Sequence, residues 1–167
     1  GGATLYTDAP TELVRKLQQH YAESATGRFD ADMVARRGFL SDLRIVETKD
    51  VPVANVKVRN LGGHLDGCRI GFDLGASDRK AAAVIDGNVI FSEEIVWNPS
   101  SQTDPAWHYD QINDSLRRVA AHLPRVDAIG GSAAGGYVDN EVRCASLFRG
   151  IPDENQDRLR RLFLDLR

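Results

Sequence analysis

The chain has 167 residues, of which 42% are hydrophobic and 27% are charged, and its formal net charge at pH 7 is −3. This composition predicts a folded protein with an apolar core and excludes wholesale disorder. Lys and Arg form no stripe that would indicate a nucleic-acid partner or a membrane surface, and no apolar run approaches the about 20 residues of a membrane span. We therefore expect a cytoplasmic protein, in which Cys68 and Cys144 are buried, reduced thiols.

The first forty residues have a helical pattern. The sequence Asp8-Ala9-Pro10 is typical of a helix start. Four apolar residues follow at helical spacing: Leu13, Val14, Leu17 and Tyr21. This helix is expected to end near Gly27. Asp30 is expected to cap a second, shorter helix, which Gly38 ends.

The next segment marks a boundary between two parts of the chain. Residues 40–52 have no clear period and are expected to be a connector, whereas the alternation in residues 53–59 predicts a strand. A glycine-rich break follows over residues 61–67. We predict a helical extension with one strand over residues 1–60 and a main domain over residues 61–167.

The main domain begins with three predicted strands, over residues 69–74, 79–85 and 88–96. The turn sequence Asp86-Gly87-Asn88 joins the second strand to the third as a hairpin. A helix is predicted to start at Asp104-Pro105 and to end at a proline. Its apolar face is formed by Ile112, Leu116, Val119 and Leu123.

The last part of the chain is predicted to return to the sheet. Residues 126–131 form a short buried strand that leads into a small-residue loop over 132–136, and residues 141–147 are another strand. A final amphipathic helix that carries Leu159 and Leu162 is expected to continue to Arg167. A meander followed by a helical crossover into a parallel strand predicts an α/β fold with a mixed sheet and flanking helices.

The first of these strands ends at the carboxylate of Asp73 and leads into a turn of small residues. A lone carboxylate there is costly to desolvate unless it meets water, a donor or a cation. In the turn, Gly75 and Ala76 leave backbone N–H groups open to an anion, and Ser77 adds a hydroxyl donor. Asp73 would hold Mg²⁺ through water beside a phosphate. Lys80 either reaches that phosphate or is solvated, and an ordinary tight turn is the alternative for the whole segment.

A second stretch of small residues, residues 130–136, follows the strand over 126–131. Small residues at a strand exit leave space where α/β folds place ligands. The alternative is close packing of this loop against a helix. Elsewhere, His20, His108 and His122 fall on predicted helices and are expected at the surface.

The two small-residue segments, residues 72–77 and 129–136, occur in the same order around a hairpin and a helix as in a known superfamily. They resemble the N-terminal half of the actin-like ATPases, which share an RNase H-like fold and include sugar kinases, actin and heat-shock chaperones. The most similar group is ROK (repressor, open reading frame, kinase). The resemblance covers residues 68–167 and implies that the main domain is the N-terminal lobe of a ROK-like protein.

The resemblance implies ATP and Mg²⁺ as cofactors, with phosphoryl transfer to a sugar or a related hydroxyl compound. The implied phosphate-binding residues are Asp73, Gly75, Ala76, Ser77 and Lys80, with Mg²⁺ held by Asp73 through water. The implied substrate cleft is bordered by Ser132, Ala133, Gly135, Gly136 and Asn140.

The chain departs from the family pattern at identifiable positions. Ala76 replaces the second glycine of the phosphate turn, and Leu147 stands where a sugar-contacting asparagine is expected. The Asn-Asp motif with the family's catalytic base is not found, so we expect this chain to be part of a longer protein and to be inactive alone. Two alternatives remain open: a non-catalytic module that senses nucleotides or sugars, and an oligomerisation domain that forms a homodimer through its third strand or its last helix.

Overall fold

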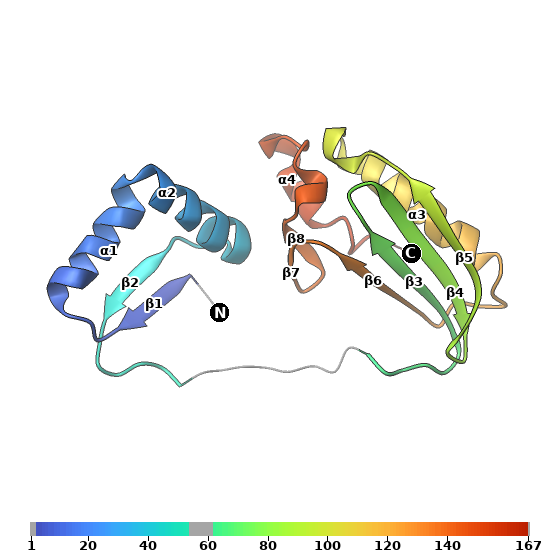
Figure 1. Ribbon diagram of the computed structural model, residues 1–167, viewed down its shortest axis with the longest axis horizontal. Coiled ribbons are helices and arrows are strands. Elements are labelled where there is room, and N and C mark those ends of the chain that lie inside the picture. Colours follow the sequence, from blue (N-terminus) through green and yellow to red (C-terminus); the bar gives the residue numbers. More distant parts are fainter. Residues whose placement is uncertain (1–2, 54–61, 167) are drawn as a thin grey trace. The chain divides into compact units, whose positions relative to one another are not determined.

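The computed structural model describes residues 3–53 and 62–166. Its contacts divide the chain into two compact units, Gly1–Arg59 and Asn60–Arg167, here called unit 1 and unit 2 (Figure 1). The strand predicted over residues 53–59 lies, apart from Val53, outside the described residues. None of the helices described is long and apolar enough to cross a membrane.

Unit 1 is a pair of short parallel strands connected through helices. β1 and β2 are paired over four residues each, with Thr4 opposite Arg44. Figure 1 shows the helices leaving β1 and returning to β2. In chain order the elements are β1 (Thr4–Thr7), α1 (Thr11–Glu23), α2 (Ala25–Ala31), a π-helix (Asp32–Gly38) and β2 (Arg44–Glu47).

Three predictions for unit 1 were wrong. The first helix ends at Glu23 and not near Gly27, because Ser24 is extended and its Oγ accepts a hydrogen bond from the Gly27 N–H at 2.9 Å. This cap starts α2 at Ala25, so Asp30 lies inside that helix and does not cap it. The expected connector over residues 40–52 contains β2, whose four residues are too few to show a strand period.

Unit 2 is built on a four-stranded mixed sheet in the order β5-β4-β3-β6. β3, β4 and β5 are antiparallel neighbours, and β6 is parallel to β3. The predicted hairpins, crossover helix and mixed sheet are therefore confirmed. The elements are β3 (Cys68–Leu74), β4 (Asp78–Ile85), β5 (Asn88–Val96), a 3₁₀ turn (Pro99–Ser101), α3 (Pro105–Ala120), β6 (Ala128–Ala133), β7 (Gly136–Val138), β8 (Glu141–Cys144), two further 3₁₀ turns (Ser146–Phe148 and Asp153–Asn155) and α4 (Gln156–Arg160).

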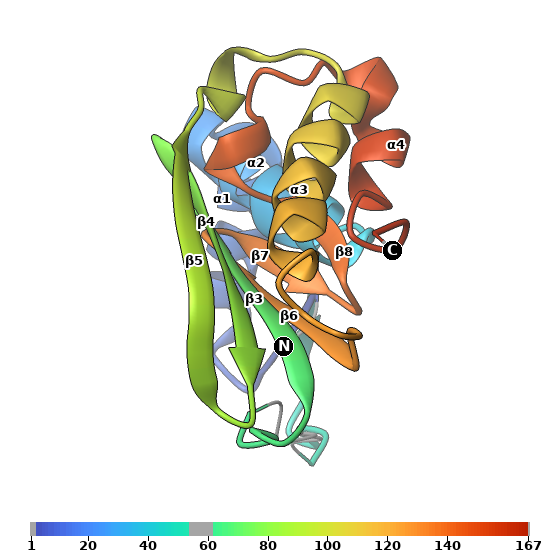
Figure 2. The same cartoon turned by 90° about the vertical axis from the view of Figure 1, so that its right-hand side faces the viewer.

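The core of unit 2 lies between the sheet and α3, which packs across one sheet face (Figure 2). Asp104 caps α3 by accepting a hydrogen bond from the Ala106 N–H at 2.9 Å, and Pro105 supplies a preset first turn. Alternate residues of β3 and β4 meet the apolar stripe of the helix. The core includes Ile70, Leu74, Ala81, Ala83, Ile112, Leu116 and Val119.

The last segment differs most from the sequence prediction. α4 ends at Arg160, so the helix does not continue to Arg167. Leu159 and Leu162 are each 4% exposed and belong to the core, so they offer no apolar helix face to a partner. The strand expected over 141–147 ends at Cys144, and Leu147 lies buried in the 3₁₀ turn that follows.

One prediction about a histidine and one about a cysteine also need correction. His108 is fully buried instead of lying at the surface: its ring nitrogens contact the backbone oxygens of Asp104 and Pro99 at 3.2 and 3.0 Å. This imidazole ties α3 to the loop that precedes it. Cys68 is a buried free thiol, as expected, whereas Cys144 is only partly buried.

Candidate functional site

Asp73 lies where the antiparallel and parallel parts of the sheet meet. It is opposite Lys80 on β4 and opposite Ser132 on β6. Side-chain alternation places it on the face opposite the buried Ile70 and Leu74, so its carboxylate is exposed. The Ser132 hydroxyl donates a hydrogen bond to Asp73 Oδ1. The fold thus joins the first residue of the predicted phosphate site to the first residue of the predicted substrate cleft.

The turn after Asp73 is fixed from both sides. The Gly75 N–H donates to the Asp78 backbone oxygen at 2.9 Å, which closes the turn. Trp97, which is buried, donates its backbone N–H to the Ser77 oxygen at 3.0 Å and its ring Nε1–H to the Gly75 oxygen at 2.8 Å. Within the described ranges, no acceptor lies at the N–H groups of Ala76 and Ser77. Both residues are exposed, so these two N–H groups are open to solvent.

The side chains around the turn form hydrogen bonds and ion pairs with one another. The Ser77 hydroxyl donates to Asp78 Oδ2 at 2.9 Å, and the Lys80 ammonium contacts Asp78 Oδ1 and lies 3.9 Å from Glu94. The hydrogen bond from Lys80, and after it that from Ser77, lowers the pKa of Asp78 below its ordinary value. The same contact with Asp78 raises the pKa of Lys80. An anion at the turn would therefore compete with Asp78 for both donors.

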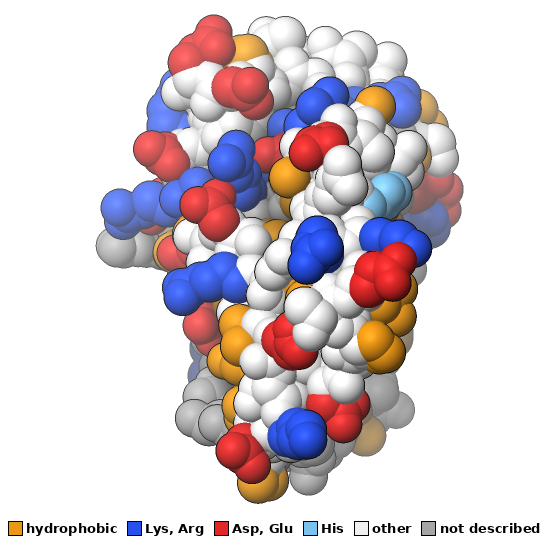
Figure 3. All heavy atoms as spheres, turned by 90° about the vertical axis from the view of Figure 1, so that its left-hand side faces the viewer, with side chains coloured by type: hydrophobic (Ala, Val, Ile, Leu, Met, Phe, Trp, Pro, Cys, Tyr) orange, Lys and Arg blue, Asp and Glu red, His pale blue; other side chains and the backbone are white. Residues whose placement is uncertain are grey.

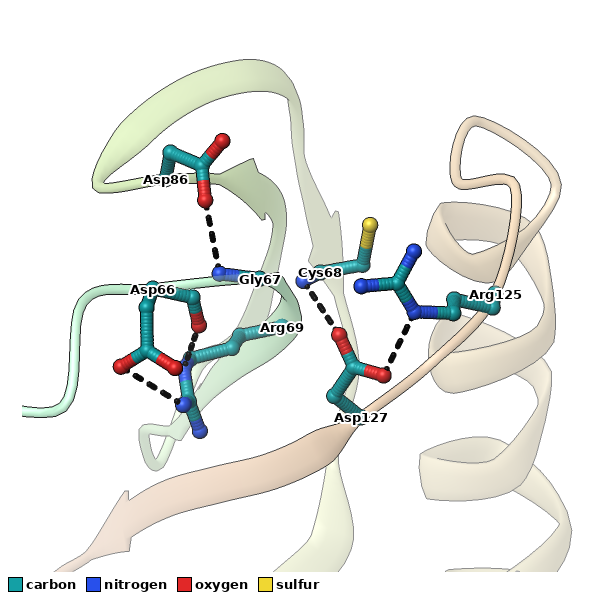
Figure 4. A network of polar contacts seen from close by, with 7 residues as sticks. All are labelled: Asp66, Gly67, Cys68, Arg69, Asp86, Arg125 and Asp127. Carbon is teal, nitrogen blue, oxygen red and sulfur yellow. Dashed lines mark hydrogen bonds and ion pairs between the residues drawn. The ribbon is translucent and has the colours of Figure 1, made fainter.

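A polar network at the other end of β3 fixes its register (Figure 4). Asp127 accepts a hydrogen bond from the Cys68 N–H at 2.8 Å and forms an ion pair with Arg125 at 2.7 Å. Asp86 in the hairpin turn accepts from the Gly67 N–H at 2.7 Å. The bond from Arg125, followed by that from Cys68, lowers the pKa of Asp127. Because these contacts tie the start of β3 to both neighbouring strands, they set which residues lie opposite Asp73.

The predicted cleft corresponds to a hollow of about 420 Å³ beside β6, here called the aromatic hollow. Of the predicted cleft residues, Ser132, Ala133 and Asn140 line it, whereas Gly135 and Gly136 do not. Its walls include three aromatic residues that the sequence analysis missed: Phe72, Tyr137 and Phe163. They come from three separate segments, and no sequence signal joins them. The rings of Phe72 and Phe163 are stacked at 6.3 Å between centroids.

Glycines at the aromatic hollow make room for their neighbours. A Cβ on Gly131 would lie 2.1 Å from the Phe72 ring, so the ring occupies the space of the missing side chain. A Cβ on Gly135 would lie 2.6 Å from that of Ala145, and Gly135 has a φ of +148°, which other residues rarely adopt. Burial raises the pKa of Tyr137 to about 12. Close packing thus accounts for two of these glycines, but the contacts are with β3 and the end of β8 and not with a helix, as the alternative had it.

The residues present suit one mode of magnesium binding. Among residues 3–53 and 62–166, no group of three or more His, Cys, Asp or Glu side chains is placed to hold a metal. Magnesium bound beside phosphates needs only one or two carboxylates and keeps several waters. Asp73 is exposed and retains Oδ2 for such a role, with Oδ1 oriented by Ser132. The donor set fits a phosphate-linked Mg²⁺ and no metal cage built from protein alone.

No family model matches the chain, and no curated protein is similar to it. Among solved structures, an exopolyphosphatase from Cytophaga hutchinsonii is similar with a TM-score of 0.31 and 9% sequence identity. The match covers 72% of this chain and 47% of that one, so the chain spans about half of its length. Similarity at this level shows neither a family nor a function.

Proposed function

We propose that unit 2 is the phosphate-binding lobe of a ROK-like actin-like ATPase, and that the whole protein transfers a phosphoryl group from ATP to a sugar or a related hydroxyl compound. The observation that carries this proposal is the pair of open N–H groups at Ala76 and Ser77, fixed beside the exposed carboxylate of Asp73. Backbone N–H groups held in this way bind phosphate oxygens. In a purely structural turn water would bind these exposed N–H groups, so the nucleotide titration below decides between the two.

Each residue at the turn then has a separate role. The Ala76 and Ser77 N–H groups bind phosphate oxygens, and Ser132 orients the carboxylate of Asp73 toward a water-bound Mg²⁺. When bound, Mg²⁺ would neutralise charge on the phosphates. Lys80 would move from Asp78 to a phosphate, since both are anionic partners for the same ammonium group. Positioning and charge neutralisation account for most of phosphoryl-transfer catalysis.

The aromatic hollow is the proposed place for the hydroxyl substrate. Tyr137 and Phe163 offer apolar surfaces for the face of a sugar ring, and Asn140 offers hydrogen-bonding groups for its hydroxyls. Among the described residues, no Asp or Glu lines the aromatic hollow. A base that removes the proton of the attacking hydroxyl must come from elsewhere, which is why we propose that this chain works within a larger protein.

Nucleotide titration of the full-length protein tests the proposal. Isothermal titration calorimetry with ADP and ATP in Mg²⁺ should show binding that Asp73→Asn weakens at least about tenfold, equivalent to about 1.4 kcal/mol. The matched control is Asp110→Asn, which removes an exposed carboxylate from α3 and should leave affinity unchanged. Absence of nucleotide binding, or equal affinities in all three proteins, would refute the assignment.

The engagement of both Ser77 and Lys80 with Asp78 favours a second candidate, a module that senses nucleotide without turning it over. Such a module binds the nucleotide with an affinity that depends on Asp73 but gives no product. Assaying a panel of sugars for phosphorylation by the same full-length protein separates the two functions.

The edge strand β5 favours a third candidate, a homodimer. Its Val89 and Ile90 are 64% and 47% exposed, and β5 has a neighbour on only one side in the described sheet. An exposed apolar edge is a template for strand pairing. Analytical ultracentrifugation of the wild type and of Ile90→Lys measures this, and a dimer that dissociates in the variant is the expected outcome.

A further inference from the structure

Unit 1 contains a hollow of about 650 Å³ that none of the functional assignments uses. It is formed by the end of α1, by α2, by the π-helix and by β2 with the two residues before it, and we call it the arginine hollow. The lining residues on which its chemistry depends are Tyr21, Arg28, Asp32, Arg36, Asp42 and Arg44.

The carboxylates of this hollow are already neutralised. Asp42 forms an ion pair with Arg36 at 2.9 Å, and Asp32 forms one with Arg37 at 2.9 Å. Both acidic side chains in the lining therefore have a guanidinium partner from the same unit. The remaining arginines are thus not needed to balance them.

Two guanidinium groups are left over. Arg28 donates one hydrogen bond, from Nη1 to the Glu23 backbone oxygen at 2.9 Å, and has no carboxylate within ion-pair distance among the residues described. For Arg44 the described part of the chain supplies neither a carboxylate nor a hydrogen-bond acceptor for the side chain. Both line the arginine hollow. The hollow therefore presents a local excess of positive charge in a protein whose net charge is −3.

A second observation, separate from the charges, concerns the backbone conformation beside the arginine hollow. Residues Asp32–Gly38 form a π-helix, a rare conformation that occurs frequently at functional sites. Its wider turn brings Arg37 onto Asp32, five residues before it, and presents Arg36 to the hollow. On the face of the molecule in Figure 3, acidic and basic side chains lie among one another.

We propose that the arginine hollow binds a small anionic molecule through an oxyanion, a phosphate or a carboxylate, held by Arg28 and Arg44. Guanidinium groups bind both kinds of oxyanion through paired hydrogen bonds, and each unpaired arginine supplies several donors. Tyr21 and Ile45 also line the hollow and supply apolar surface for the remainder of the ligand. This site lies within unit 1 and is independent of the function proposed for unit 2.

The test uses the full chain and two probes, inorganic phosphate and citrate, which distinguish the two oxyanions at constant ionic strength. Calorimetry should show saturable binding of at least one probe, and Arg28→Ala with Arg44→Ala should weaken it at least about tenfold. The matched control is Arg15→Ala with Lys49→Ala, which removes two exposed positive charges of unit 1 that do not line the hollow. This control should keep the wild-type affinity.

Three outcomes would overturn the proposal: no saturable binding of either probe, an unchanged affinity in the hollow variant, or an equal loss in the control. If the double variant loses its helical circular dichroism, Arg44→Lys replaces it. That change keeps the charge but removes the forked donor pair, so the affinity should fall severalfold. Asp73→Asn must leave the binding unaltered, which separates this site from any phosphate bound at unit 2.

Discussion

The two small-residue segments of unit 2 look alike in sequence but serve different purposes. In the turn over residues 75–77, small side chains leave the N–H groups of Ala76 and Ser77 open. In the segment over residues 130–136, the Phe72 ring fills the space where a side chain of residue 131 would lie. Gly135 has a positive φ and lies so close to Ala145 that a larger residue would clash. Small residues therefore indicate either exposed backbone donors or close packing, and the neighbouring side chains decide which.

The largest expected effect comes from filling the space at Gly131. In Gly131→Ala the new Cβ overlaps the Phe72 ring, so the ring must leave its stacked position on Phe163. Overpacking of this kind costs about 1–3 kcal/mol. Thermal unfolding followed by circular dichroism should show the melting temperature falling by about 4–8 °C for each kcal/mol lost.

Gly130→Ala is the matched control, because a Cβ there meets nothing within 4 Å. It should leave the melting temperature unchanged or raise it, since alanine loses less backbone entropy in a strand than glycine does. If both variants melt alike, the space at Gly131 is not occupied by Phe72, and the contrast between the two segments disappears.

The first three strands of unit 2 could be predicted because their turns carry strong signals, whereas β6 lies two residues later than expected and is mostly exposed instead of buried. β3, β4 and β5 follow the expected ranges to within one residue, and Asp73 lies at the expected strand end. The pairing of Asp73 with Ser132 could not be predicted, since these residues are 59 positions apart and their register depends on contacts at Asp127 and Asp86.

The missed features share a physical cause. The aromatic hollow combines Phe72, Tyr137 and Phe163, each of which is a partly buried aromatic residue within its own segment. In unit 1, β1 and β2 are four residues long and pair across an intervening set of helices, so neither shows a local strand signal. The sequence indicates local elements well, whereas sites assembled from distant segments appear only in the fold.

A smaller effect is expected from restoring glycine at the turn. Ala76→Gly removes a Cβ beside the open N–H groups, so it should strengthen Mg-ADP binding to the full-length protein severalfold under the proposed function. It should also lower stability by about 0.5–1 kcal/mol, because glycine raises the entropy of the unfolded chain. Calorimetry and thermal unfolding measure the two effects. Ala76→Ser retains the Cβ, and a matching gain in affinity there would show that the Cβ is not the obstacle.

The smallest effect is spectroscopic and concerns the packed segment. Tyr137 has a pKa raised to about 12 by burial, so its hydroxyl stays protonated in the folded protein after an unfolded tyrosine has ionised near pH 10. Its contribution to stability is therefore complete below about pH 10 and is lost as the pH rises toward 12. Absorbance at 295 nm should show a late-titrating tyrosine that Tyr137→Phe removes and Tyr6→Phe retains. A late component that survives in Tyr137→Phe would mean that the packing around Gly131 and Gly135 does not bury this ring.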